Sequence, residues 1–124
     1  MRIALCAPFM EADLLEQKIR EAVPEEKIEI DEYRRIDALL ALPGLFMYDA
    51  VWVAFPGAAG MEAVFAVREQ NPDAPIVWVI NDPGFIQGGT GRRLSMFLMP
   101  DSPLEEFRTA VDNSRRTQGR RNCQ

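Results

Sequence analysis

The chain has 124 residues, of which 48% are hydrophobic and 27% are charged, which suits one globular domain and is too short for two. Its formal net charge of -5 argues against a folded body that binds nucleic acid through a basic face. The chain contains no histidine, so it lacks the commonest general base and the commonest zinc ligand. This composition argues against most hydrolytic mechanisms.

Hydrophobic periodicity in the first third of the chain predicts alternating strands and helices. Residues 3–7 form a continuous apolar run, as in a buried strand, and residues 11–23 repeat apolar side chains at helical spacing until Pro24. Charged and apolar residues alternate over 27–32, which predicts a half-exposed edge strand. A short helix is expected over 36–42, before a Pro-Gly pair.

The middle of the chain predicts two buried strands separated by a helix. An apolar run over 50–55 ends at Pro56-Gly57, a pair that stops a strand and starts a loop. Helical spacing begins at Met61 and predicts a helix over 61–70. Residues 76–80 are continuously apolar, as in strands that are buried on both faces of a parallel sheet.

The last third combines a breaker-rich segment with one strand and one helix. Residues 81–93 contain too many prolines and glycines for a full helix, so a loop with at most one or two helical turns is expected. A strand is predicted over 94–99, and a last helix opens at Ser102-Pro103. Residues 114–124 contain four arginines and no apolar periodicity, which predicts a frayed helix end.

Five strands that alternate with helices predict an α/β fold with a single parallel sheet and helices on both faces. The expected architecture is a flavodoxin-like three-layer sandwich with the strand order 2-1-3-4-5, in which helix four is short or missing. The domain is expected to span residues 1–116, and residues 117–124 are expected to form a disordered basic tail.

The cysteines and the first residues of the chain indicate the cellular compartment in which the protein resides. Cys6 and Cys123 have no metal-binding spacing, which favours a reduced, cytoplasmic environment. The apolar start over 1–9 is too short to cross a membrane, and Glu11 and Asp13 follow it in place of a signal-peptide cleavage pattern. We therefore expect a cytoplasmic protein without membrane contact.

The pattern resembles response-regulator receiver domains from residue 1 to about residue 116, and it is most similar to the receivers that precede LytTR-type DNA-binding domains. The order and spacing of five segments carry the likeness: MRIALC, IDEYRRIDALL, YDAVWVAFPGAAGMEAV, NPDAPIVWVIND and FLMPDSPLEEFRTAVDNSRR. The resemblance implies a module of two-component signal transduction and transcription regulation.

In receivers that are phosphorylated, acidic residues after the first strand hold Mg²⁺, and an aspartate that ends the third strand accepts the phosphoryl group. The resemblance places the acidic positions on Ala7 and Pro8. It places the acceptor on Ala54, or on Trp52 if Gly60 sets the register. Side chains at these positions supply no metal oxygen and no phosphoacceptor.

A hydroxyl after the fourth strand and a lysine after the fifth respond to the phosphoryl group in such receivers. The hydroxyl position falls on Asn81, and the lysine position falls on Met99 or is deleted. All the roles are lost together, so the resemblance implies a degenerate, non-phosphorylatable receiver that acts through protein–protein contact. We expect a homodimer or another protein partner, no cofactor, no metal and no enzymatic activity. Nucleic acid is expected only through an output domain outside this chain, or weakly through the arginine tail.

Two alternatives remain open from the sequence. Phosphotransfer could use a shifted acid such as Asp49 or Asp82, although these residues, like Glu62 and Asp101, are better interpreted as solvated charges.

The other alternative is a small-molecule sensor whose neutralised pocket lies between Ala7, Ala54 and Asn81 at the carboxyl edge of the sheet. Trp52 and Trp78 lie in neighbouring predicted strands, so an aromatic-lined pocket for a planar ligand is conceivable there, although a core role is the commoner one.

The loop over 87–93 is a candidate contact for an anion or a partner. Backbone N–H groups at Gly88 and Gly89 and the guanidinium groups of Arg92 and Arg93 would suit an anion, but the segment matches no phosphate-binding fingerprint. The same glycines also suit a simple connection in place of helix four. In the receivers that it resembles, this segment borders the surface used for dimerisation.

Overall fold

Five parallel strands form one sheet in the order β2-β1-β3-β4-β5, which confirms the predicted topology. The computed structural model describes residues 1–35, 37–38, 41, 48–55, 57–70, 75–79, 96–99 and 101–122. The strands have the following bounds: β1 (Arg2–Cys6), β2 (Glu29–Tyr33), β3 (Ala50–Val53), β4 (Ile76–Val79) and β5 (Met96–Leu98).

Side-chain polarity explains the place of each strand in the sheet. β3 and β4, with the sequences AVWV and IVWV, are buried along their whole length because the layers on both faces of a central parallel strand exclude water. β2, with the sequence EIDEY, is an edge strand and keeps its polar side chains half-buried or exposed. It was predicted over 27–32, and it begins and ends slightly later, at Glu29 and Tyr33.

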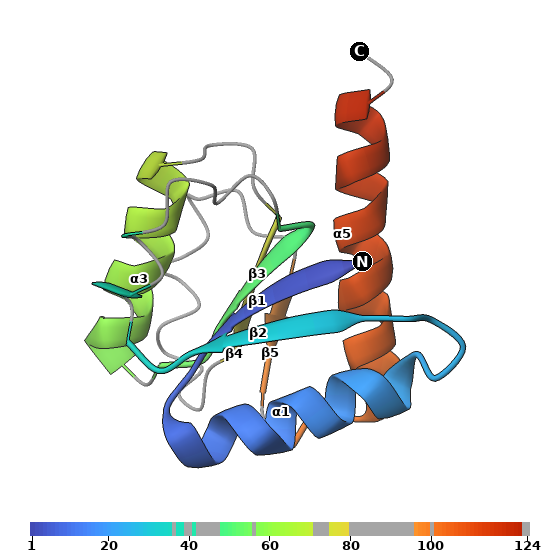
Figure 1. Ribbon diagram of the computed structural model, residues 1–124, viewed down its shortest axis with the longest axis horizontal. Helices are drawn as coiled ribbons and strands as arrows, with labels where there is room; N and C mark the ends of the chain where they lie inside the picture. The colour runs from blue at the N-terminus through green and yellow to red at the C-terminus, as the bar shows by residue number, and fades with distance from the viewer. Residues whose placement is uncertain are drawn as a thin grey trace.

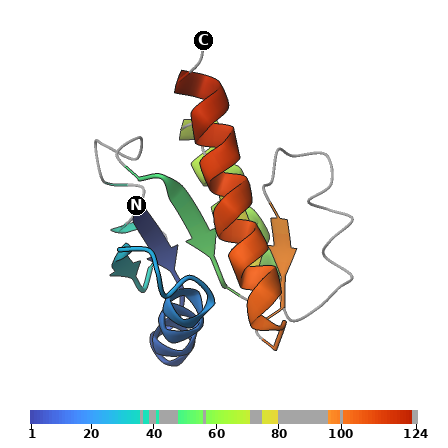
Figure 2. The same ribbon diagram turned by 90° about the vertical axis from the view of Figure 1, so that its right-hand side faces the viewer.

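Three helices cover the sheet in the described residues: α1 (Phe9–Ala22), α3 (Gly57–Gln70) and α5 (Leu104–Asn122). Figures 1 and 2 show α1 and α5 on one face of the sheet and α3 on the other. The core is accordingly divided into two clusters. One contains Leu15 of α1 and Phe107 of α5, and the other contains Val64 and Val67 of α3.

α1, predicted over 11–23, runs from Phe9 to Ala22, and the other two helices differ more from their predicted bounds. α3 begins at Gly57 and not at Met61, so the segment expected as a loop is its first turn. Apolar periodicity could not reveal this turn, because its glycines and alanines have no large side chains. α5 continues to Asn122, so residues 117–122, which were expected in a disordered tail, are helical.

The predicted helix over 36–42 lies mostly outside the described residues, although the Ala41 N–H donates to the Asp37 carbonyl at 3.0 Å, as in a helical turn. The predicted loop over 81–93 lies outside them entirely. Within the described part of the chain, no helix is both long enough and apolar enough to span a lipid bilayer.

Candidate functional site

The carboxyl ends of β1 and β3 lie side by side and bring Ala7 and Ala54 to the same edge of the sheet. Cys6 is paired with Val53, and the Ala54 N–H donates to the Cys6 carbonyl at 2.9 Å. The Ala7 N–H donates to the carbonyl of Tyr33 at 3.0 Å. Both alanines are buried, so the position at which a parallel α/β sheet usually holds its chemistry is occupied here by methyl groups.

Pro8 connects this edge to α1. It stands at the helix N-cap with φ −61° and ψ 158°, and its carbonyl accepts a 2.9 Å hydrogen bond from the Ala12 N–H. Proline suits a helix start because the first turn leaves its N–H groups without helical partners, so a missing N–H costs little. Its ring supplies no side-chain oxygen to a metal.

The end of β3 distinguishes between the two residues that could occupy the acceptor position. Trp52 lies within the strand, fully buried, and its ring stacks on Phe107 at 5.9 Å between centroids. Ala54 follows the last residue of β3 at the edge of the sheet. Ala54 therefore occupies the edge, and Trp52 belongs to the core under α5.

Met99 follows β5, at the position that the resemblance assigns to a lysine. Its N–H donates to the Ser102 hydroxyl at 3.0 Å, and the Ser102 N–H donates back to the Met99 carbonyl at 3.0 Å, which fixes the turn into α5. The side chain of Met99 is exposed and carries no charge. The remaining predicted site residues lie outside the described residues: Asn81, Gly88, Gly89, Arg92 and Arg93.

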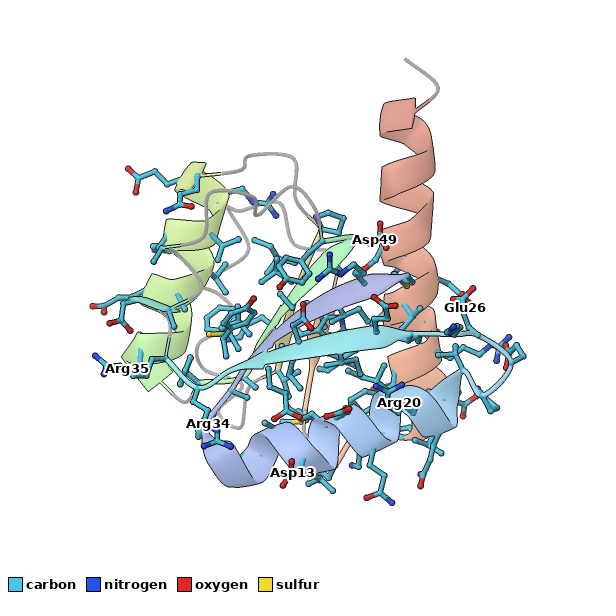
Figure 3. All side chains as sticks on the ribbon, in the orientation of Figure 1. Asp13, Arg20, Glu26, Arg34, Arg35 and Asp49 are labelled. Atoms are coloured by element: carbon cyan, nitrogen blue, oxygen red, sulfur yellow. The ribbon has the colours of Figure 1, made fainter. Side chains whose placement is uncertain are left out.

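Asp49 is not near this edge, which corrects the hypothesis of a shifted phosphoacceptor at that residue. It precedes β3, and its carboxylate accepts a hydrogen bond from the Arg2 N–H at 2.7 Å, while its own N–H donates to the Arg2 carbonyl at 2.8 Å. Figure 3 shows Asp49 where β1 and β3 begin, at the opposite edge of the sheet from Ala54. Glu62 and Asp101 are exposed, as expected of solvated charges, and Asp82 lies outside the described residues.

Trp52 and Trp78 face opposite sides of the sheet, which contradicts a shared aromatic pocket. The strand register pairs Trp52 with Val77 and Trp78 with Val53, so the two indoles alternate in direction. Trp52 packs in the cluster under α1 and α5, whereas Trp78 packs in the cluster under α3. In the described residues, no group of three or more His, Cys, Asp or Glu side chains is arranged to hold a metal ion.

A polar network that the sequence analysis missed links β1, β2 and the segment before β3. Asp31 accepts hydrogen bonds from the Arg2 guanidinium at 2.9 Å and from the Tyr48 hydroxyl at 2.8 Å, and the hydroxyls of Tyr33 and Tyr48 are hydrogen bonded to each other. Arg2 also lies 5.3 Å from the centre of the Tyr48 ring. Burial, together with these bonds, raises the pKa of the Tyr48 hydroxyl. The network joins β1, β2 and the start of β3 and is structural.

A pair of carboxyl groups joins α1 to β2. A hydrogen bond from Glu16 raises the pKa of Glu32 to about 7, with burial and the nearby charges of Glu16 and Asp13 acting in the same direction. The same hydrogen bond, together with Arg20, lowers the pKa of Glu16. A hydrogen bond between two carboxyl groups favours a state with one proton between them, because two neighbouring negative charges repel.

The buried thiol of Cys6 is inert. Burial raises its pKa to about 12, so very little of the reactive thiolate is present near neutral pH.

Structural comparison identifies the fold. No protein-family model matches the sequence, and no curated protein matches it. The chain is similar to a sensor protein from Polaromonas sp. JS666, with a TM-score of 0.74 and 18% identity over 94% of this chain and 97% of that one. It is also similar to the signal receiver domain of a putative LuxO repressor protein from Vibrio parahaemolyticus, with a TM-score of 0.77 and 10% identity over 99% and 96%. A third similar structure is a DNA-binding response regulator of the LuxR family from Staphylococcus aureus, with a TM-score of 0.68 and 13% identity over 91% and 97%.

These similarities show that the chain has the flavodoxin-like fold of receiver domains. At such low identities they establish the architecture, and function must be argued from the site itself.

Proposed function

We propose that the chain is a receiver-like signalling module that phosphorylation does not switch and that acts through protein–protein contact, including contact with itself. One observation carries the proposal: Ala7, Pro8 and Ala54 occupy the carboxyl edge of β1 and β3, where a phosphorylatable receiver needs acidic side chains. The module is proposed to be non-catalytic and cytoplasmic and to use no metal cofactor.

Phosphoryl transfer explains why these side chains matter. The transferred group carries several negative charges, which a magnesium ion and fixed positive groups must balance. Magnesium needs oxygen ligands, usually from one or two carboxylates with water. Two alanines and a proline offer no side-chain oxygen, and the neutral Met99 stands at the position that the resemblance gives to lysine. The described residues of this edge therefore do not supply the usual charge balance.

A module that phosphorylation does not switch exposes its protein-binding surface at all times. A switch needs a ligand or a modification that binds two conformations with different affinity. Without a phosphoryl group to provide that difference, output would depend on the presence and concentration of the chain and its partner. The similar receiver of a repressor and the similar DNA-binding response regulator support a place in a two-component or transcription-regulatory pathway.

The direct test is exposure to phosphoryl donors. The chain is incubated with acetyl phosphate, and separately with beryllofluoride, each with Mg²⁺, and is followed by intact mass and by tryptophan fluorescence, with a phosphorylatable receiver as the positive control. We expect no added mass and no fluorescence change that saturates. A stoichiometric adduct on this chain would refute the proposal.

A ligand screen separates the proposal from the small-molecule sensor hypothesis. Thermal shift is measured against nucleotides and common metabolites, with Ala54→Leu as a variant that fills the carboxyl edge of the sheet. A saturable rise in melting temperature that this variant abolishes would favour the sensor. We expect neither the wild type nor the variant to respond.

A further inference from the structure

A shallow, open groove of about 460 Å³ runs along the exposed face of α1. Its walls are mostly carbon, and three of its lining residues carry carboxylates; the lining consists of Asp13, Glu16, Gln17, Arg20, Glu21 and Pro24. These residues follow one another at helical spacing, so they form a continuous stripe along the helix.

The stripe lies on the exposed face of α1, and only its edge, formed by Glu16 and Arg20, approaches β2. Arg20 donates from its guanidinium to the Ile28 carbonyl at 2.8 Å, just before β2, and Figure 3 shows its side chain between the two elements. The opposite flank of α1 faces α5, where the Lys18 ammonium lies 5.5 Å from the centre of the Phe107 ring. The chain's own α5 therefore does not cover the groove.

The arginine-rich end of α5 has the charge that complements this groove. Four arginines and no acidic residue follow Asp112, whereas the chain as a whole has a net charge of -5. The rest of the chain therefore carries the negative charge. In the groove three carboxylates outnumber one guanidinium, that of Arg20, which is ion-paired with Glu16 at 3.1 Å.

The direction of α5 prevents contact between the groove on α1 and the arginine-rich end of α5 within one chain. Near its start, Arg108 bonds to the carboxylate of Glu25 at 2.5 Å and to the carbonyl of Ala22 at 3.3 Å, so α5 meets α1 at the end of α1. At 1.5 Å per residue, Asn122 lies about 20 Å farther along the helix. Figures 1 and 2 show that this end projects beyond the sheet and away from α1.

We propose that the groove on α1 receives the arginine-rich end of α5 from a second copy of the chain. This inference rests on the proposed function, because it names the surface for the self-contact. Arginine suits such a groove: its methylene stem packs against carbon walls, and its guanidinium pairs with carboxylates. The groove and the helix end are different surfaces, so the contact is head-to-tail and its products are rings or open chains of copies.

The strength of the contact should depend steeply on salt. Exposed ion pairs are individually weak, and the Debye length falls from about 30 Å at 0.01 M salt to about 3 Å at 1 M. We expect self-association of the full chain at low salt, measured by sedimentation equilibrium and light scattering over a concentration series, and dissociation at high salt.

Charge reversal identifies the two surfaces. The groove variant is Asp13→Lys with Glu21→Lys, the helix-end variant is Arg120→Glu with Arg121→Glu, and a fourth protein carries all four changes. The control for the groove variant, Glu62→Lys with Glu69→Lys, makes the same change in net charge as that variant on exposed positions of α3. Circular dichroism confirms that each protein is folded.

Each double reversal should weaken association at least about tenfold, whereas the fourfold variant should recover it and the α3 control should retain it. A monomeric wild type at low salt would overturn the inference, as would a groove variant that associates like the wild type. In the latter case the proposed function stands, because another surface makes the contact.

An adduct with beryllofluoride would instead refute the proposed function and would not affect the measurement of self-association. Binding of polylysine to the groove of a chain that does not self-associate would assign the groove to another basic partner and also overturn the inference.

Discussion

The indole of Trp52 stacks on the ring of Phe107, with 5.9 Å between the ring centroids and 8° between the ring planes. Both side chains are fully buried, and they join the centre of the sheet to α5. The contact therefore holds in place the helix whose end we propose to carry the self-contact.

Truncation of this stack should cause a large loss of stability. Phe107→Ala is expected to lower the free energy of unfolding by about 3–5 kcal/mol, because it removes a large buried side chain and leaves a cavity against Trp52. Phe107→Leu should cost less, because it keeps much of the volume. Urea denaturation followed by circular dichroism measures both, and a loss below about 1 kcal/mol for the alanine variant would contradict a packed stack.

Gly60 should not tolerate a methyl group. A Cβ atom at this position would lie 2.2 Å from the Phe55 carbonyl oxygen and 2.9 Å from Trp78 Nε1, so α3 would have to move away from the sheet. Gly60→Ala is therefore expected to destabilise the fold by about 1–3 kcal/mol.

Helix propensity alone predicts the opposite sign for Gly60→Ala, a gain of about 1 kcal/mol, so denaturant unfolding decides between the two effects. Ala59→Gly, at the exposed neighbouring position, serves as the reference. It should cost about 1 kcal/mol or less, because it changes propensity without a steric contact.

The Glu16 and Glu32 pair should make stability fall as the pH rises toward neutral. The folded state raises the pKa of Glu32 from 4.5 to about 7, so in this interval it binds a proton that the unfolded chain releases. The contribution of this bound proton to the free energy of unfolding is present at low pH and is lost as the pH rises through about 7. The lowered pKa of Glu16 acts in the opposite sense at lower pH.

Glu32→Gln tests this assignment, because the amide can still donate to Glu16 but cannot release a proton. Melting temperatures of both proteins are compared at pH 5 and pH 8 at constant ionic strength. We expect the fall in melting temperature between the two pH values to be smaller in the variant. An unchanged fall would show that other groups control the pH dependence.

Tyr48 should resist ionisation until the chain unfolds. Its pKa is raised because burial and the hydrogen bonds with Tyr33 and Asp31 all oppose a phenolate at this position. The chain contains only two tyrosines, so comparing the alkaline titration of phenolate absorbance in the wild type and in Tyr48→Phe identifies the contribution of Tyr48. The variant should also lose about 1 kcal/mol of stability, because Asp31 loses a hydrogen-bond donor. Reversible ionisation of Tyr48 in the folded chain would contradict the network.

Much of the fold was predictable because the buried strands are short apolar runs. The segments around β3 and β4 are apolar throughout, and the alternating charges of β2 identify an edge strand. The parallel sheet followed from the alternation of strands and helices, and the strand order was predicted as the flavodoxin-like order of such folds. The first turn of α3 was missed, because small residues carry no hydrophobic period and their role depends on the close approach of Gly60 to Phe55 and Trp78.

The candidate site was only partly predictable. The structure places Ala7 and Ala54 at the carboxyl edge, since each follows the end of a strand, whereas Trp52, the other residue considered for the acceptor position, lies within β3. The core role that the sequence analysis favoured for Trp52 and Trp78 is confirmed, and they share no pocket, because strand register places the two side chains on opposite faces of the sheet. The partnership of Asp31 with Tyr48 could not be seen, because the two residues come from different strand segments and meet only through the sheet.

By itself the sequence determined the chemical inventory: no histidine, a net charge of -5, apolar runs of strand length and no carboxylate at Ala7, Pro8 or Ala54. Composition and hydrophobic periodicity are properties of the sequence alone, so they can be recognised without coordinates. Only the tertiary structure decided that Asp49 lies at the far edge of the sheet, that Glu16 meets Glu32, and that the basic end of α5 projects away from the acidic flank of α1. These relationships join residues that are distant in the sequence, and their geometry follows from the packing of helices and strands against each other.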